Sequence, residues 1–122
     1  MTRWIAIAAA ALVSLLPLAA RAEGNAPPPD TKEGRLIFED NCIFCHGEQG
    51  KGNGVGSWAL RPKPANFTDL EHMAKIPGPA LRKAILQGGK AVGASRAMPA
   101  WKDALTEEQV DAVLAYILSI GK

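Results

Sequence analysis

The chain has 122 residues, of which 48% are hydrophobic and 21% are charged, and its formal net charge is +2. This length predicts a single small domain. Basic side chains are scattered along the chain and form no run longer than Arg82 and Lys83. The charge pattern therefore predicts neither a nucleic-acid-binding surface nor a membrane-binding one.

The first 22 residues have the pattern of a secretory signal peptide. Arg3 gives a positive start, residues 5–18 are apolar except for Ser14 and Pro17, and residues 20–22 read Ala-Arg-Ala, which fits the A-x-A cleavage pattern. We therefore expect cleavage after Ala22 and a periplasmic location. A retained membrane anchor is the alternative, but the apolar run is shorter than the roughly 20 residues that span a bilayer, and Pro17 interrupts it.

Cleavage would leave residues 23–122, in which 12 basic and 12 acidic side chains balance. Residues 23–30 include three consecutive prolines and are too polar to build a core, so we expect a flexible tail. Residues 31–122 are expected to form the folded domain.

Residues 31–41 have a helical pattern, and Asp30 or Thr31 can cap the first turn. Gly34 and Phe38 lie four residues apart and therefore share one face of this helix. A Gly inside a helix costs up to about 1 kcal/mol relative to Ala, and it usually marks the close approach of another backbone. The sequence thus indicates that a second element packs on this face.

The clearest amphipathic helix lies at the end of the chain. Thr106 and Gln109 have the spacing of a capping box, which opens a helix. Apolar side chains then recur at helical spacing and are expected to face inward: Val110, Val113, Leu114, Ile117 and Leu118. We expect this helix to pack against residues 31–41.

A shorter helix is expected between these two. Pro79 is suited to its first turn, and Gly88 and Gly89 end it. Residues 90–102 are expected to form a loop that carries Met98 and Pro99.

Cys42, Cys45 and His46 form the motif C-x-x-C-H, which covalent attachment of a c-type haem requires. The two thiols can add to the haem vinyl groups while the imidazole binds the iron. One helical turn brings the three side chains toward one face, so five consecutive residues contain the chemistry. We therefore expect one covalently bound haem c per chain.

Other uses of these residues explain less. A structural zinc site needs four ligands, and the chain has only two Cys and two His, the second being His72. A thioredoxin-like C-x-x-C would follow a strand, whereas a helical pattern precedes Cys42. A disulfide between Cys42 and Cys45 would close a very short loop and would leave His46 without a role.

The residues after His46 are suited to surrounding a bulky group. Five glycines fall within residues 47–56, which disfavours regular structure and lets the backbone approach closely. Pro62 and Pro64 then restrict the chain. We expect a backbone carbonyl of residues 62–64 to accept a hydrogen bond from the ring nitrogen of His46 that does not bind iron, because such a bond orients a ligand imidazole.

Three side chains can supply a sixth iron ligand: His72, Met73 and Met98. A methionine is more often a core residue than a ligand, so residue type does not decide between them. Met98 is favoured by its position in a loop between two helices, where Pro99 stiffens the backbone and Trp101 can pack beside the sulfur.

Several of these features together resemble a small bacterial class I c-type cytochrome. They are Gly34 and Phe38 before C-x-x-C-H-G, the Gly-rich loop, the Pro-containing segment, Met98 with Pro99, and Tyr116 in the terminal helix. The resemblance covers residues 31–120. It implies an all-α cytochrome c fold whose N-terminal and C-terminal helices cross near Gly34, Phe38, Val113 and Tyr116 and pack around one covalently attached haem.

The resemblance also implies roles for individual residues. Residues 31–122 would form a monohaem domain in which Cys42 and Cys45 attach the haem and His46 and Met98 are the axial iron ligands. The implied function is that of a periplasmic one-electron carrier, not an enzyme, that exchanges electrons with redox partner proteins and touches a membrane only through them. The alternatives are an electron-transfer subunit of a larger dehydrogenase complex and a haem-based peroxidase or gas sensor.

Overall fold

The computed structural model describes residues 29–122. The predicted signal peptide, residues 1–22, and residues 23–28 of the predicted tail lie outside the described residues. The described part contains helices and no strand, which confirms the all-α prediction. In chain order the helices are α1 (Thr31–Asn41), α2 (Ile43–His46), α3 (Leu70–Met73), α4 (Gly78–Gln87), the 3-10 helix η1 (Gly89–Val92) and α5 (Glu107–Ser119).

The two long terminal helices begin at the predicted caps. The Asp30 side chain accepts a hydrogen bond from the Lys32 N–H at 2.8 Å, so Asp30 is the N-cap of α1. At α5, the Thr106 hydroxyl accepts from the Gln109 N–H, and the Gln109 side chain accepts from the Thr106 N–H, at 3.2 and 3.0 Å. The predicted capping box is therefore present, and it satisfies amides that a helix end leaves without partners.

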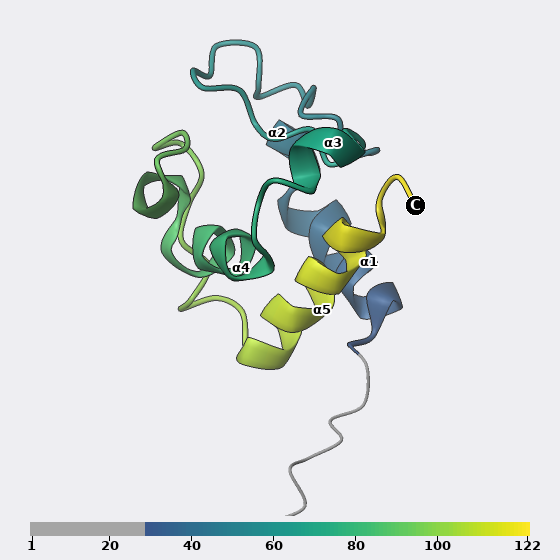
Figure 1. Cartoon of the computed structure of the whole chain (residues 1–122). Coiled ribbons are helices and arrows are strands. Elements are labelled where there is room, and N and C mark those ends of the chain that lie inside the picture. The colour runs from purple at the N-terminus through teal and green to yellow at the C-terminus, as the bar shows by residue number, and fades with distance from the viewer. Residues whose placement is uncertain (1–28) are drawn as a thin grey trace, which may run out of the picture.

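Helices α1 and α5 lie side by side and cross at Gly34, as predicted (Figure 1). A Cβ atom added to Gly34 would overlap the backbone carbonyl of Ala112, so only glycine permits this crossing. Phe38 is fully buried one turn further along, with its ring centroid 5.4 Å from that of Tyr116. The close approach that Gly34 indicated is thus made by α5.

One prediction about the face of α5 was wrong. Leu118 is 37% exposed, whereas Ala112 is buried. Because α5 turns Ala112 and Tyr116 toward Gly34, the buried arc of the helix is centred on its crossing with α1, and Leu118 falls beyond it.

Helix α4 lies on the other side of the molecule from α1 (Figure 1). It has a proline in its first turn and ends at Gly88, whose φ of 82° turns the chain. Its buried residue Ile85 packs into the core, and Arg82 bonds Glu107 and Asp111 of α5, the latter at 2.9 Å. Helix α4 is therefore fixed to α5 by both apolar and ionic contacts.

The segment after α4 also differs from the prediction. Residues Gly89–Val92 form the 3-10 helix η1 instead of an irregular loop. The Ala91 N–H donates to the Gly88 carbonyl and the Gly93 N–H to the Lys90 carbonyl, which winds the chain into one tight turn. Within residues 29–122, no helix has both the length and the apolar character needed to cross a bilayer.

Candidate haem site

Helix α2 is a single turn that presents the C-x-x-C-H motif. Cys42 ends α1 and precedes α2, and its carbonyl accepts from the N–H groups of Cys45 and His46 at 3.2 and 2.9 Å. Cys42 and Cys45 form no disulfide with each other. The motif follows a helix and not a strand, which disfavours the thioredoxin-like alternative.

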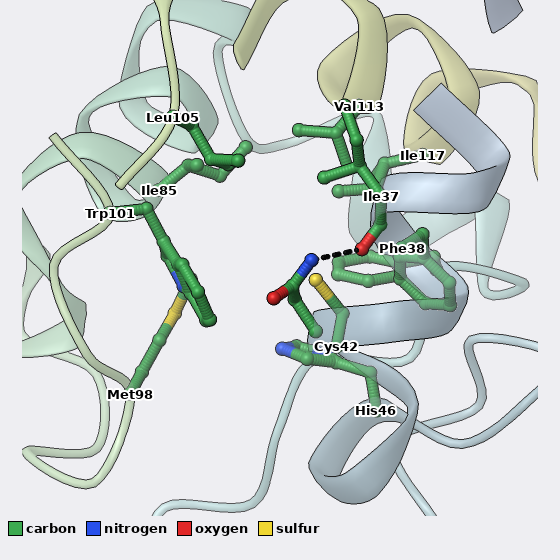
Figure 2. Close-up of a pocket in the computed structure, with 12 residues that line it drawn as sticks. Ile37, Phe38, Cys42, His46, Ile85, Met98, Trp101, Leu105, Val113 and Ile117 are labelled. Atoms are coloured by element: carbon green, nitrogen blue, oxygen red, sulfur yellow. Dashed lines mark hydrogen bonds between the residues drawn. The ribbon is translucent and has the colours of Figure 1, made fainter. Parts of the chain in front are cut away.

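An apolar pocket, partly open to solvent, lies between the helices (Figure 2). Most of its wall is hydrocarbon, from Ile37, Phe38, Phe67, Ile85, Trp101, Leu105, Val113 and Ile117. The other lining side chains are Asn41, Cys42, His46 and Met98.

Figure 2 shows Cys42 and His46 on one side of this pocket and Met98 with Trp101 on the other. Met98 and Trp101 both line the pocket, in line with their expected proximity. The structure therefore brings an imidazole, a thiol and a thioether to one apolar space. Cys45 lies half-buried beside His46 in α2 and does not line the pocket.

The other two candidates for a sixth ligand lie elsewhere. His72 is exposed on the short helix α3. Met73 is partly buried and packs against the core. Neither side chain lines the pocket, whereas Met98 does.

The His46 ring is oriented by a backbone carbonyl, but not by the predicted one. Nδ1 of His46 lies 3.3 Å from the carbonyl oxygen of Ala65, one residue beyond the expected segment 62–64. The Pro64 carbonyl faces Gly52 instead, where an added Cβ atom would overlap its oxygen. Because a carbonyl can only accept, Nδ1 must carry the proton, which leaves the lone pair on Nε2.

Phe67 supports the same ring from its face. The two ring centroids are 4.7 Å apart with an interplanar angle of 16°, a stacked arrangement. Phe67 is 5% exposed and also packs edge-on against Phe38. The sequence analysis missed both Ala65 and Phe67, because no spacing rule links them to His46, 19 and 21 residues away.

Burial favours the uncharged forms of the His46 imidazole and the Cys42 thiol. It lowers the pKa of His46 below its ordinary value of 6.5, and the Ala65 carbonyl opposes this effect only in part. Burial, and secondarily the neighbouring Cys45, raises the pKa of the Cys42 thiol to about 11. At neutral pH the imidazole is therefore neutral, which is the form that binds metal.

These residues fit a covalently bound haem. A neutral imidazole and a thioether that face each other across an apolar pocket are the donor pair used by c-type haem proteins. The Cys42 thiol at the same pocket, and Cys45 one turn along, are the attachment groups that the motif supplies. The hydrocarbon wall matches an apolar macrocycle.

Comparison with known proteins identifies the family of this chain. The family described as cytochrome c matches residues 31–121. Cytochrome c6 of Thermosynechococcus vestitus is 35% identical over 113 residues, covering 93% of this chain and 84% of that protein. The solved structure of the KustC0563 c-type cytochrome is similar with a TM-score of 0.60 and 26% identity, covering 73% of this chain and 98% of the other.

A longer relative matches only in part. The cbb3-type cytochrome c oxidase subunit FixP of Bradyrhizobium diazoefficiens is 34% identical over 92 residues, which cover 75% of this chain. The match spans only 28% of the length of FixP. Together with the all-α fold and the pocket, the match over residues 31–121 shows that this chain is a small class I c-type cytochrome, a member of the cytochrome c family of electron-carrying proteins with covalently bound haem.

Proposed function

We propose that this protein is a periplasmic one-electron carrier in which Cys42 and Cys45 hold the haem and His46 and Met98 bind its iron from opposite sides. The observation that carries the proposal is the apolar pocket with His46 and Met98 on opposing walls and the Cys42 thiol beside them. The bound haem would supply an iron centre that gains and loses one electron.

The protein's own residues would make that exchange efficient. The Ala65 carbonyl and the Phe67 ring fix the imidazole in orientation and tautomer, so little has to reorganise at this ligand. The apolar wall would limit the access of water to the iron, and a thioether ligand would raise the reduction potential. If His46 and Met98 both bind the iron, no position would stay open for peroxide or gas, which would favour a carrier over an enzyme or sensor.

The signal-peptide pattern and the haem-attachment motif both support the proposed periplasmic location. Residues 1–22 have the pattern of a signal peptide, and c-type haem is attached to proteins outside the cytoplasm. Fractionation of cells that express the full chain tests this location. Recovery of haem-containing protein from the cytoplasm would contradict it.

The absorption spectrum of the oxidised protein tests the ligands. The wild type should show the weak sulfur-to-iron band in the far red, and Met98→Ala should abolish it, because no other pocket-lining side chain offers a thioether. Met73→Ala is the matched control, since Met73 is outside the pocket, and should keep the band. Ready binding of CO by the ferrous wild type would reject the carrier in favour of a sensor or enzyme.

A second candidate is a stable electron-transfer subunit of a larger respiratory complex. It is supported by the match to FixP, which is named as an oxidase subunit. Purification of the native protein under mild conditions separates the two candidates. Elution as a single small species supports the carrier, whereas recovery with one stoichiometric partner supports the subunit.

A further inference from the structure

Backbone hydrogen bonds tie the segment that follows Met98 to the end of α4. The Trp101 N–H donates to the Ile85 carbonyl at 2.9 Å, and the Lys102 N–H donates to the Leu86 carbonyl at 3.2 Å. Both acceptors belong to the last turn of α4, where carbonyl groups have no partner within the helix. Residues 101–102 therefore supply partners for two carbonyl groups at the end of α4.

Met98 itself is held by residues that precede it in the chain. The Gly89 N–H donates to the Met98 carbonyl at 3.1 Å, and the Met98 N–H donates to the Ser95 carbonyl at 3.2 Å. Met98 is thus bonded through both of its backbone groups. Its position follows from that of the α4 end and not only from its side chain.

Glycine is required for this arrangement. A Cβ atom added to Gly89 would overlap the carbonyl oxygen of Ser95 and lie 3.1 Å from Cβ of Met98. At Gly88, whose φ is 82°, it would lie 2.9 Å from the carbonyl oxygen of Met98. The overlapped groups are backbone atoms, so no side-chain rotation can relieve the overlap.

The α4 end is itself a fixed reference point. Ile85 is 7% exposed and lines the same pocket as Met98. One turn earlier, Arg82 pairs with Glu107 and Asp111 of α5. A side chain added at position 89 would therefore displace residues 95–98, and α4 would keep its place.

We propose that Gly89 is a positioning residue for Met98, which sets the place of the sulfur in the pocket before iron is bound. The inference rests on the proposed function, in which Met98 is the sixth ligand. If Gly89 has this role, the protein backbone, and not the iron–sulfur bond, holds residues 95–98 against α4.

Gly89→Ala tests the proposal directly. Gly89 has an ordinary φ, so the added methyl group introduces only the clash with residues 95–98. The oxidised variant should lose the sulfur-to-iron band. Its ferrous form should bind CO roughly tenfold or more tightly than the wild type, because a displaced sulfur no longer has to leave before CO enters.

Two controls separate positioning from stability. Gly78→Ala changes the other end of α4, where an added methyl meets nothing within 4 Å, and should keep the band and the CO affinity of the wild type. Val110→Ala destabilises a fully buried site of α5 that does not line the pocket, and should lower the melting temperature while keeping both readouts.

Amide hydrogen exchange of the Met98→Ala holoprotein gives an independent test that does not require Gly89→Ala to fold. This variant keeps the backbone carbonyl that Gly89 bonds, so the amides of Gly89, Trp101 and Lys102 should stay protected to within about tenfold of the wild type. Loss of their protection would overturn the proposal, because it would show that the iron–sulfur bond holds the segment.

The possible outcomes test the positioning role of Gly89 separately from the ligation of iron by Met98. If the wild type has the band, Met98→Ala loses it and Gly89→Ala keeps it with unchanged CO affinity, the inference fails and the proposed ligation stands. If the wild type lacks the band, the ligation fails first and the inference fails with it. Loss of the band in Gly89→Ala, with protected amides in Met98→Ala, supports both.

Discussion

Two neighbours hold the His46 side chain by different parts of its ring. The Ala65 carbonyl binds Nδ1 at 3.3 Å, which fixes the tautomer, while Phe67 covers the ring face at a centroid distance of 4.7 Å. The hydrogen bond is a backbone contact that no side-chain substitution removes. Phe67 can be changed, so its contribution is measurable.

Replacing Phe67 with Leu should keep most of the buried hydrocarbon but lose the stack on His46. We expect a loss of about 0.5–1.5 kcal/mol in the free energy of unfolding, the usual worth of an aromatic pair beyond its burial. Phe67→Ala should cost about 3–5 kcal/mol, because it also leaves a cavity. Guanidinium unfolding of the holoprotein measures both, and equal losses in the two variants would contradict a specific role for the stack.

At the scale of helices, the crossing of α1 and α5 depends on a missing side chain. Gly34 lies against the Ala112 carbonyl, and Phe38 and Val113 fill the space one turn away. A glycine is a poor helix former, so this position gives up intrinsic helix stability to bring two backbones together.

Gly34→Ala separates helix propensity from the clash with α5, because the two change the free energy of unfolding in opposite directions. Helix propensity alone would stabilise the protein by up to about 1 kcal/mol. We instead expect a loss of about 1–3 kcal/mol or more, because the methyl group must push α5 away. Gly78→Ala in α4, with no neighbour within 4 Å, is the matched control and should be neutral or slightly stabilising. Thermal unfolding followed by circular dichroism measures both, and a stabilised Gly34→Ala would refute the tight crossing.

At the scale of the whole molecule, the core and the pocket wall are largely the same residues. Among residues 29–122, six of the eight buried hydrophobic residues also line the pocket: Ile37, Phe38, Phe67, Ile85, Val113 and Ile117. The protein therefore has little core that is independent of what fills the pocket. A group bound only by the folded state stabilises that state by mass action.

Replacing both Cys42 and Cys45 with Ala should therefore leave a largely unfolded protein without haem. A domain of this size buries only about two-thirds of its surface, and without haem the apolar side chains of the pocket wall would lose the group that they pack against. Circular dichroism and a thermal melt should show low helicity and no cooperative transition. Met98→Ala, which keeps both thiols, is the folded control, and a compact, cooperatively melting double variant would count against this prediction.

The local features of this protein could be predicted from sequence because they depend on neighbours along the chain. The C-x-x-C-H turn, the Asp30 cap, the capping box of Thr106 and the end of α4 at Gly88 each need only a few consecutive residues with fixed spacing. The resemblance to the cytochrome c family then predicted the crossing of α1 and α5, which the structure confirms.

Contacts between distant segments were decided by the tertiary structure. The carbonyl that binds His46 belongs to Ala65 and not to residues 62–64, because the Pro64 carbonyl faces Gly52. Leu118 is exposed because the orientation of α5 follows from the Gly34 crossing, which helical periodicity alone does not determine. The bonds between the α4 end and residues 98–102 likewise join groups far apart in the chain, so the position of Met98 depends on how the helices pack and not on any local pattern.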